Sequence, residues 1–189
     1  HPAVRFHIKY GHASEMNSLL LSGELDFAFL DSFAVDSQIA TVPIWDETLA
    51  LCCGQEYVQQ VFGEKKIIHD KETYDQLDFV DYVEGAPVLS MWFNHHLQNS
   101  FIPNVRASLM DVQGISRIIR EGLGAGILPL HVVNRINQAG TSLFVFQGSG
   151  EPLHNTISLA SLEGRTLSSS AKFTRNYLME NLPKNLANI

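Results

Sequence analysis

The sequence is poor in cysteine. Its two cysteines, Cys52 and Cys53, are adjacent, so they form neither the disulfide framework of a small secreted domain nor a CxxC redox motif. Neighbouring residues on a strand point to opposite faces, and we therefore expect two separate, structural thiols. Free thiols favour a reducing compartment, which indicates a cytoplasmic protein.

The sequence also lacks an excess of basic residues and any apolar run of transmembrane length. It contains 13 Lys and Arg residues against 20 Asp and Glu residues, and its formal net charge is −7. An acidic chain repels the phosphate backbone of nucleic acid, which argues against direct contact with DNA. The first residues do not have the pattern of a signal peptide. We expect no association with a membrane.

Motifs of metal sites and of common catalytic sites are absent. The sequence contains eight histidines, but neither HExxH nor CxxC followed by histidine occurs. His95 and His96 lie on a predicted helix, where adjacent side chains are about 100° apart and cannot share one face. The GxSxG elbow of serine hydrolases is missing as well. We therefore expect no metal, no cofactor and no enzyme activity.

Hydrophobic patterning predicts an α/β fold. Residues 4–10 alternate apolar and polar side chains, residues 25–31 form an apolar run, and a helix that Ser14 caps lies between these two strands. This order is a βαβ unit, and a second βα series begins at Leu77. Further strands are expected within 39–54 and at 77–83, 105–110, 125–129, 143–147 and 157–162, and further helices at 56–63, 89–101, 112–121, 130–138 and after 168–170.

A glycine-rich stretch, SRIIREGLGAGILPLHVV at residues 116–133, has the composition of a phosphate-binding loop. Its order is reversed, because the predicted helix precedes the glycines and a strand follows them. The stretch predicts a tight helix-to-strand passage instead. Gly122 takes a left-handed conformation after the helix, while Gly124 and Gly126 allow close contact with neighbouring backbone. Pro129 then opens the next helix.

Four blocks of the sequence carry a family resemblance. They are VRFHIKYGHASEMNSLLLSGELDFAFLD, VPIWDETLALCC, GLGAGILP and ISLASLEGRTLSSSAKFTRNYL. In this order, and over nearly the whole chain, they resemble the effector-binding domain of LysR-type transcriptional regulators. The third block resembles the family pattern V-x-x-G-x-G-I-x-x-L-P.

The resemblance implies a fold like that of the type-2 periplasmic binding proteins, with two α/β lobes joined by two crossing strands. Lobe I would comprise residues 1–76 and 143–189, and lobe II residues 77–142. It also implies a small-molecule-sensing regulatory domain that binds its effector in the cleft between the lobes and works as a homodimer or homotetramer. DNA contact would come only through an N-terminal winged helix-turn-helix that this sequence does not contain.

Candidate effector contacts follow the ends of the expected strands. Ligands of open α/β sheets bind beyond the carboxyl ends of the strands, where helices begin. The resemblance implies contacts at His12, at Asp31 and around 90–92, and the strand ends extend this set. The candidates are His12, Ser14, Asp31, Ser32, Ser90, Met91, Trp92, Asp111, Val112 and Gln113.

Several candidates also have a purely structural interpretation. Ser14 and Asp111 are typical helix caps, which is the favoured reading of both. Trp92 could belong to the core, and Asp31 could be a solvated loop residue. The carboxylates at Asp31, Glu84 and Asp111 favour a neutral, cationic or aromatic effector, although the N-termini of helices attract anions.

The sequence departs from the family pattern at its beginning. The family's domain normally starts with one more strand and helix before the block that matches residues 4–10. That strand lies inside the lobe I sheet, and its loss would leave unpaired backbone groups in the sheet. We therefore expect this segment to exist in the natural protein.

A periplasmic solute-binding protein of the same fold is the alternative interpretation, since a fold does not determine a function. The free thiols and the order of the four blocks favour the regulator. A signal peptide upstream would favour the solute-binding protein, and a helix-turn-helix upstream would favour the regulator.

Overall fold

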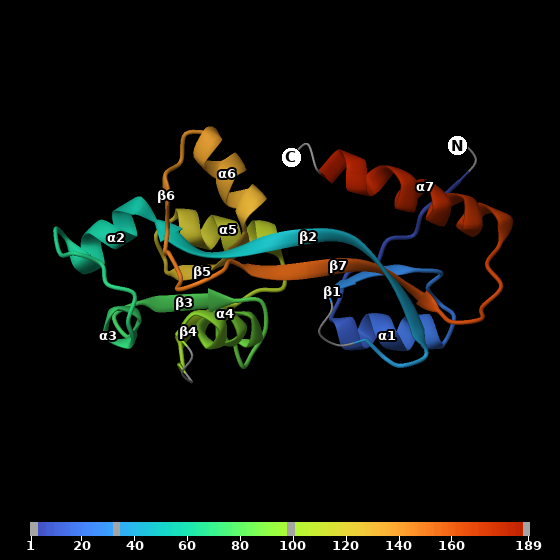
Figure 1. The fold of residues 1–189 in the computed structure, drawn as a ribbon, viewed down its shortest axis with the longest axis horizontal. Coiled ribbons are helices and arrows are strands. Elements are labelled where there is room, and N and C mark those ends of the chain that lie inside the picture. The colour runs from blue at the N-terminus through green and yellow to red at the C-terminus, as the bar shows by residue number, and fades with distance from the viewer. Residues whose placement is uncertain (1–3, 32–34, 98–100, 187–189) are drawn as a thin grey trace. The chain divides into compact units, whose positions relative to one another are not determined.

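The computed structural model describes residues 4–31, 35–97 and 101–186, with side chains up to residue 182. Helices and strands alternate along most of the chain (Figure 1). The helices are α1 (Ala13–Leu21), α2 (Gln55–Phe62), α3 (Lys71–Tyr74), α4 (Pro87–Leu97), α5 (Val112–Arg120), α6 (Leu130–Gln138) and α7 (Ser169–Leu186). The strands are β1 (Ala28–Asp31), β2 (Ile39–Gly54), β3 (Asp78–Asp81), β4 (Asn104–Ser108), β5 (Ala125–Pro129), β6 (Leu143–Val145) and β7 (Leu153–Leu162).

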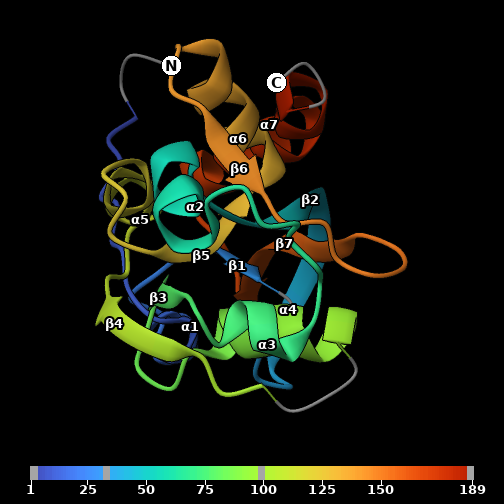
Figure 2. The ribbon, with the colours of Figure 1, turned by 90° about the vertical axis from the view of Figure 1, so that its left-hand side faces the viewer.

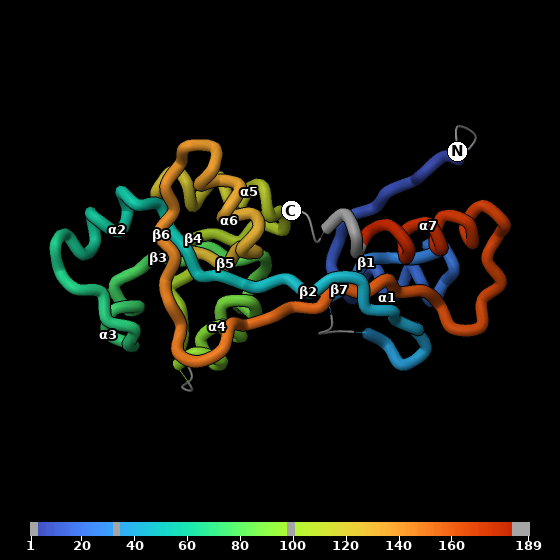
Figure 3. The backbone as a smooth tube through the Cα atoms, turned by 45° about the horizontal axis from the view of Figure 1, so that its top comes forward, coloured from blue at the N-terminus to red at the C-terminus, as the bar shows by residue number. Residues whose placement is uncertain are grey.

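The chain divides into two compact units. The first unit comprises residues 1–47 and 155–189, and the second comprises residues 48–154. Strands β2 and β7 both continue from one unit into the other, so the chain passes between the units twice (Figure 3). The predicted lobes assign residues 48–76 and 143–154 to lobe I, whereas these compact units assign them to the second unit.

The first unit is built around the antiparallel pair of β1 and β7. Ala28 lies opposite Ala160, and Asp31 lies opposite Ile157. Helix α1 packs its apolar side chains Met16 and Leu20 on this pair, which gives a small core. The predicted order of helix and strand is therefore confirmed for α1 and β1, but β1 is not buried on both faces, because Phe29 is 47% exposed and β1 pairs antiparallel with β7.

The predicted strand over residues 4–10 is not formed. This segment has no regular secondary structure, and its apolar residues Phe6, Ile8 and Tyr10 are 63%, 72% and 91% exposed. A strand is stable only when a neighbour satisfies its backbone N–H and C=O groups. No described strand pairs with this segment. The alternation of apolar and polar side chains fits a strand, but it does not show whether a neighbouring strand is present to pair with the segment.

The second unit contains a mixed sheet with helices on both faces. β3 pairs in parallel with β4 and with β5, while β2 runs antiparallel to β5 and to β6. Successive residues of β2 enter different cores, because a strand points its side chains alternately to the two faces. Helices α3 and α4 cover one face, and α5 and α6 cover the other (Figures 1 and 2).

The two cysteines illustrate this alternation. Cys53 belongs to the core beneath α4, and Cys52 belongs to the core beneath α5. Both are free and 0% exposed. The prediction of two separate structural thiols is confirmed. Burial raises the pKa of Cys53 to about 12 and also raises the pKa of Cys52.

Neither thiol should react with a maleimide reagent in the folded protein, because a buried, protonated thiol is a poor nucleophile. We expect no mass increase under native conditions and two added labels per chain after unfolding in denaturant. Mass spectrometry of the two samples measures this. Rapid labelling of either thiol in the folded protein would contradict the arrangement of the two cores.

The glycine-rich passage between α5 and β5 has the predicted tight geometry. Gly122 follows the end of α5 with a φ of +72°. A Cβ on Gly124 would lie 2.9 Å from the Asp78 carbonyl oxygen, and one on Gly126 would lie 3.0 Å from the Val80 carbonyl oxygen. These approaches let β5 pair with β3.

The position of Pro129 differs slightly from the prediction. It ends β5 and occupies the N-cap position of α6, one residue before the first helical residue. Its missing N–H costs no helical hydrogen bond at this position. The predicted helix over 130–138 is confirmed as α6.

Candidate functional site

The second unit brings the ends of three parallel strands to one edge of its sheet. Because β3 is parallel to β4 and β5, their last residues Asp81, Ser108 and Pro129 point toward the same edge. Helices α4, α5 and α6 begin after these strands. The predicted contacts at 90–92 and 111–113 therefore lie in or next to the first turns of α4 and α5.

Asp81 is a positioning residue that the sequence reasoning missed. Its side chain is 1% exposed at the end of β3. Its carboxylate accepts hydrogen bonds from the backbone N–H groups of Tyr82 (2.7 Å) and Leu89 (3.1 Å). Burial raises the pKa of Asp81, and these hydrogen bonds oppose that rise. The sequence did contain a signal for this residue, because Asp81 is a charged residue within the mostly apolar run LDFVDYV.

Asp111 is the N-cap of α5, as its structural interpretation predicted. Its carboxylate accepts hydrogen bonds from the N–H groups of Gln113 (3.2 Å) and Gly114 (2.8 Å). Val112 is half-buried and packs against the core beneath α5. The side chains of Asp81 and Asp111 thus occupy N–H groups at the starts of α4 and α5 that would otherwise attract an anion.

Gln113 is exposed and lines a groove between α5 and α6. The groove has a volume of about 340 Å³ and is also lined by Ser116, Arg120 and Arg135. Arg120 donates a hydrogen bond to the Thr141 hydroxyl at 3.3 Å. Gln113 is therefore a predicted contact that lines this groove.

Ser90 and Met91 are half-buried on α4, and Met91 packs against the core on that face of the sheet. The N–H of Ser90 bonds to the Ala86 carbonyl at 2.9 Å. Ala86 has a φ of +50°, which is unusual for a residue with a Cβ. This strained turn sets where α4 begins, and therefore where Ser90 lies.

Trp92 lies in the core rather than at the surface, which corrects its interpretation as a direct effector contact in this structure. It is 1% exposed. Its ring lies 5.9 Å from that of Tyr74 and 5.2 Å from that of Phe93, edge to face in both cases. Leu89, Trp92, Phe93 and His96 form the buried stripe of α4. Their helical spacing turns all four toward the sheet.

In the first unit, His12 and Ser14 lie at the start of α1. His12 is the N-cap residue, and its carbonyl accepts the first helical hydrogen bond from Met16 at 2.9 Å. The prediction that Ser14 caps this helix is wrong, because α1 begins at Ala13. The Ser14 carbonyl instead accepts a hydrogen bond from the Ser18 hydroxyl at 3.0 Å. Both His12 and Ser14 are exposed.

Asp31 ends β1 and is half-buried, so it is part of the ladder with β7 rather than a loop residue. Ser32, the next candidate, lies outside the described residues. Asp31 and His12 stay predicted contacts of the first unit.

The paired histidines of α4 contact the loop before β7. The His95 ring is 2.8 Å from the Glu151 carbonyl oxygen through Nε2, and the His96 ring is 2.9 Å from the Ser149 carbonyl oxygen through Nδ1. His95 is exposed, whereas His96 is 6% exposed. Burial lowers the pKa of His96, while its hydrogen bond to Ser149 opposes that shift. No cluster of three or more metal-ligating side chains occurs among the described residues.

The free energy of unfolding should fall as the pH drops below about 6.5, the ordinary pKa of histidine. Below that pH the unfolded chain binds a proton that His96 in the folded protein binds only at lower pH. His96→Gln should remove this part of the pH dependence, and His95→Gln should retain it. Urea unfolding across this range measures the slope, and equal slopes for wild type and His96→Gln would contradict the assignment.

Comparisons with known proteins identify the family. The family model described as the LysR substrate binding domain matches residues 1–183. The chain belongs to this LysR family. Within the described ranges, no helix of this LysR domain is long and apolar enough to span a membrane. No curated protein sequence matches the chain.

Solved structures share the fold of this LysR domain at low sequence identity. The regulatory domain of CcmR from Synechocystis PCC6803, in complex with 2-PG, is 18% identical, with a TM-score of 0.73 over 96% of this chain and 85% of that chain. The effector-binding domain of QuiR in complex with shikimate is 15% identical, with a TM-score of 0.70 over 92% of this chain and 79% of that chain.

A third similar structure is the LysR-family regulator HinK from Pseudomonas aeruginosa. It is 18% identical, with a TM-score of 0.67, and the match covers 97% of this chain but 62% of the HinK chain. The fold is thus the type-2 periplasmic-binding-protein-like α/β fold that the family resemblance implied.

Proposed function

We propose that this chain is the small-molecule-sensing domain of a LysR-type transcriptional regulator. The match of the LysR family model to residues 1–183 carries this proposal. Two similar structures of effector-binding or regulatory domains hold a small molecule, shikimate in QuiR and 2-PG in CcmR. The solute-binding-protein alternative is less favoured, because the matching family is that of the regulators.

The proposed contacts are predicted residues whose side chains a ligand can reach. In the first unit these are His12, Ser14 and Asp31, and in the second unit Ser90, Met91 and Gln113. Helix α1 begins without a side-chain cap, so its first N–H groups are available to a polar group of the effector. Asp81 positions α4 and makes no proposed contact of its own.

The regulatory output follows from linkage. An effector changes the protein's state only if it binds one arrangement more tightly than another. In this proposal the domain works in a homodimer or homotetramer in the cytoplasm and reaches DNA through an N-terminal winged helix-turn-helix. The net charge of −7 supports an indirect route to DNA.

A metabolite screen tests the proposed function. Thermal-shift measurements with small metabolites, including shikimate and 2-PG, should find at least one compound that raises the melting temperature, because a ligand of the folded state stabilises it. Calorimetry should then show about tenfold weaker binding or more for His12→Ala and for Gln113→Ala.

The control variant is Asn134→Ala, since Asn134 is an exposed residue of α6 outside the proposed contacts. It should bind the compound as wild type does. Wild-type affinity in both His12→Ala and Gln113→Ala would refute their roles. A screen that finds no stabilising compound would count against the sensing function itself.

A further inference from the structure

The first unit contains a cavity of about 440 Å³ at the distal end of β7. The end of β7, the turn after it and the first two turns of α7 line this cavity. Its polar and charged lining residues are Ser161, Glu163, Arg165, Lys172, Arg175 and Asn176. The volume lies within the range of about 300–1,000 Å³ that is usual for small-molecule sites.

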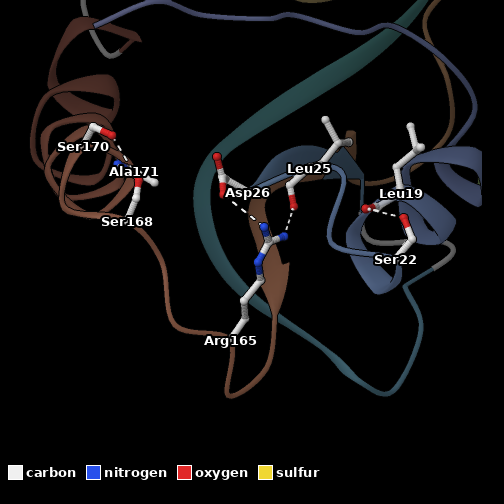
Figure 4. A network of polar contacts seen from close by, with 8 residues as sticks. All are labelled: Leu19, Ser22, Leu25, Asp26, Arg165, Ser168, Ser170 and Ala171. Atoms are coloured by element: carbon white, nitrogen blue, oxygen red, sulfur yellow. Dashed lines mark hydrogen bonds and ion pairs between the residues drawn. The ribbon is translucent and has the colours of Figure 1, made fainter.

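Arg165 is held in place at this cavity by the chain that precedes β1. Its guanidinium donates a hydrogen bond to the Leu25 carbonyl oxygen at 2.6 Å and lies 3.4 Å from the Asp26 carboxylate (Figure 4). The Arg165 side chain is 27% exposed. A fixed guanidinium loses little conformational freedom when it binds a ligand, so it is suited to be the anchor of a site.

Lys172 and Arg175 add positive charge that is not neutralised by an ion pair with any described residue. They lie three residues apart on α7, so they project from one face of the helix. Glu163 is the carboxylate among the lining residues. Because Asp26 pairs with Arg165, the unpaired positive charge at the cavity comes from Lys172 and Arg175, in a chain whose net charge is −7.

This cavity is separate from the proposed effector contacts of the first unit. Arg165 binds Leu25 and Asp26, which precede β1, whereas Asp31 ends that strand. The pairing of Ala28 with Ala160 and of Asp31 with Ile157 places the two sites at opposite ends of the β1–β7 pair. His12→Ala, which tests the effector contacts, should therefore leave this cavity unchanged.

We infer that the cavity binds a small molecule through an oxyanion, either a carboxylate or a phosphate. A planar guanidinium pairs with both groups through two parallel hydrogen bonds, and the ammonium of Lys172 adds a point charge. The amide of Asn176 and the hydroxyl of Ser161 supply neutral hydrogen-bonding groups for the rest of the molecule. The first unit thus carries a second ligand site that does not depend on the proposed effector contacts.

Calorimetric titration of the 189-residue chain with inorganic phosphate and with succinate tests this inference, with sodium chloride at matched ionic strength as the blank. At least one of the two probes should bind saturably. Lys172→Gln combined with Arg175→Gln should weaken that binding about tenfold or more. Glu163→Gln should tighten it several-fold, because it removes the carboxylate that repels the anion.

The control is Arg117→Gln, which removes one positive charge from an exposed position on α5 in the second unit, against two in the double variant. It should leave the affinity unchanged. Binding of phosphate alone would assign a phosphate ester, and binding of succinate alone would assign a carboxylate. The inference is overturned if neither probe binds, if the Lys172 and Arg175 substitutions have no effect, or if Arg117→Gln weakens binding equally.

Discussion

Gly124→Ala should lower the free energy of unfolding by about 3 kcal/mol. The new Cβ would lie 2.9 Å from the Asp78 carbonyl oxygen, closer than real Cβ atoms approach a backbone oxygen. Gly124 also has a φ of +152°, which residues with a side chain rarely adopt. Relief of the overlap would push β5 away from β3, where the Ala125–Phe79 pairing begins. Urea unfolding of the variant measures the loss.

Gly140→Ala separates the two causes of this loss. Gly140 follows α6 with a φ of +91°, and a Cβ there would have no atom within 4 Å. The free energy of unfolding of this variant should fall only by the cost of the left-handed backbone conformation for a residue with a Cβ, about 1 kcal/mol. Equal losses in the two variants would show that the approach of β5 to the Asp78 backbone has no energetic consequence.

Trp92→Ala should lower the free energy of unfolding by about 4 kcal/mol, because it removes a large side chain from a filled core. Trp92 is 1% exposed and contacts the rings of Tyr74 and Phe93, and its ring centroid is 4.4 Å from that of His96. The cavity left behind would lie under α4, which carries Ser90 and Met91. Because Trp92 makes no proposed contact itself, effector binding should weaken only in proportion to the fraction of the protein that is unfolded.

Asn94→Ala is the control on the same helix, since Asn94 is exposed and its substitution should change stability by less than about 0.5 kcal/mol. Thermal unfolding and effector affinity are measured together for both variants. A Trp92→Ala protein with wild-type stability and lost affinity would restore Trp92 as a direct ligand contact.

The candidate site could be predicted only in part. A strand followed by a capping residue is a local pattern, so Asp111 was identified as the α5 cap from its neighbours alone. The face of a helix that points to the core depends on where the sheet lies. The pattern around residues 90–92 was therefore compatible both with a surface site and with the buried position that Trp92 occupies.

The burial of polar side chains also could not be predicted from local sequence patterns. Asp81 is buried where the start of α4 folds back and donates the Leu89 N–H to its carboxylate, and His96 is buried against the distant loop around Ser149. A Cβ on Gly148 would overlap the His96 ring, so the buried position of this histidine depends on a glycine more than 50 residues away in sequence.

The sequence by itself determined the α/β alternation, the two faces of β2 that separate Cys52 from Cys53, and the tight passage at Gly122–Gly126, because each depends on residues that are neighbours along the chain. Tertiary structure alone decided whether residues 4–10 pair as a strand, whether Trp92 is buried and how Arg165 is held at the cavity beside α7. These outcomes depend on contacts between segments far apart in sequence. Only the folded chain brings such segments together. The conformational entropy lost on folding is offset by contacts throughout the core, and no single sequence motif supplies enough of them.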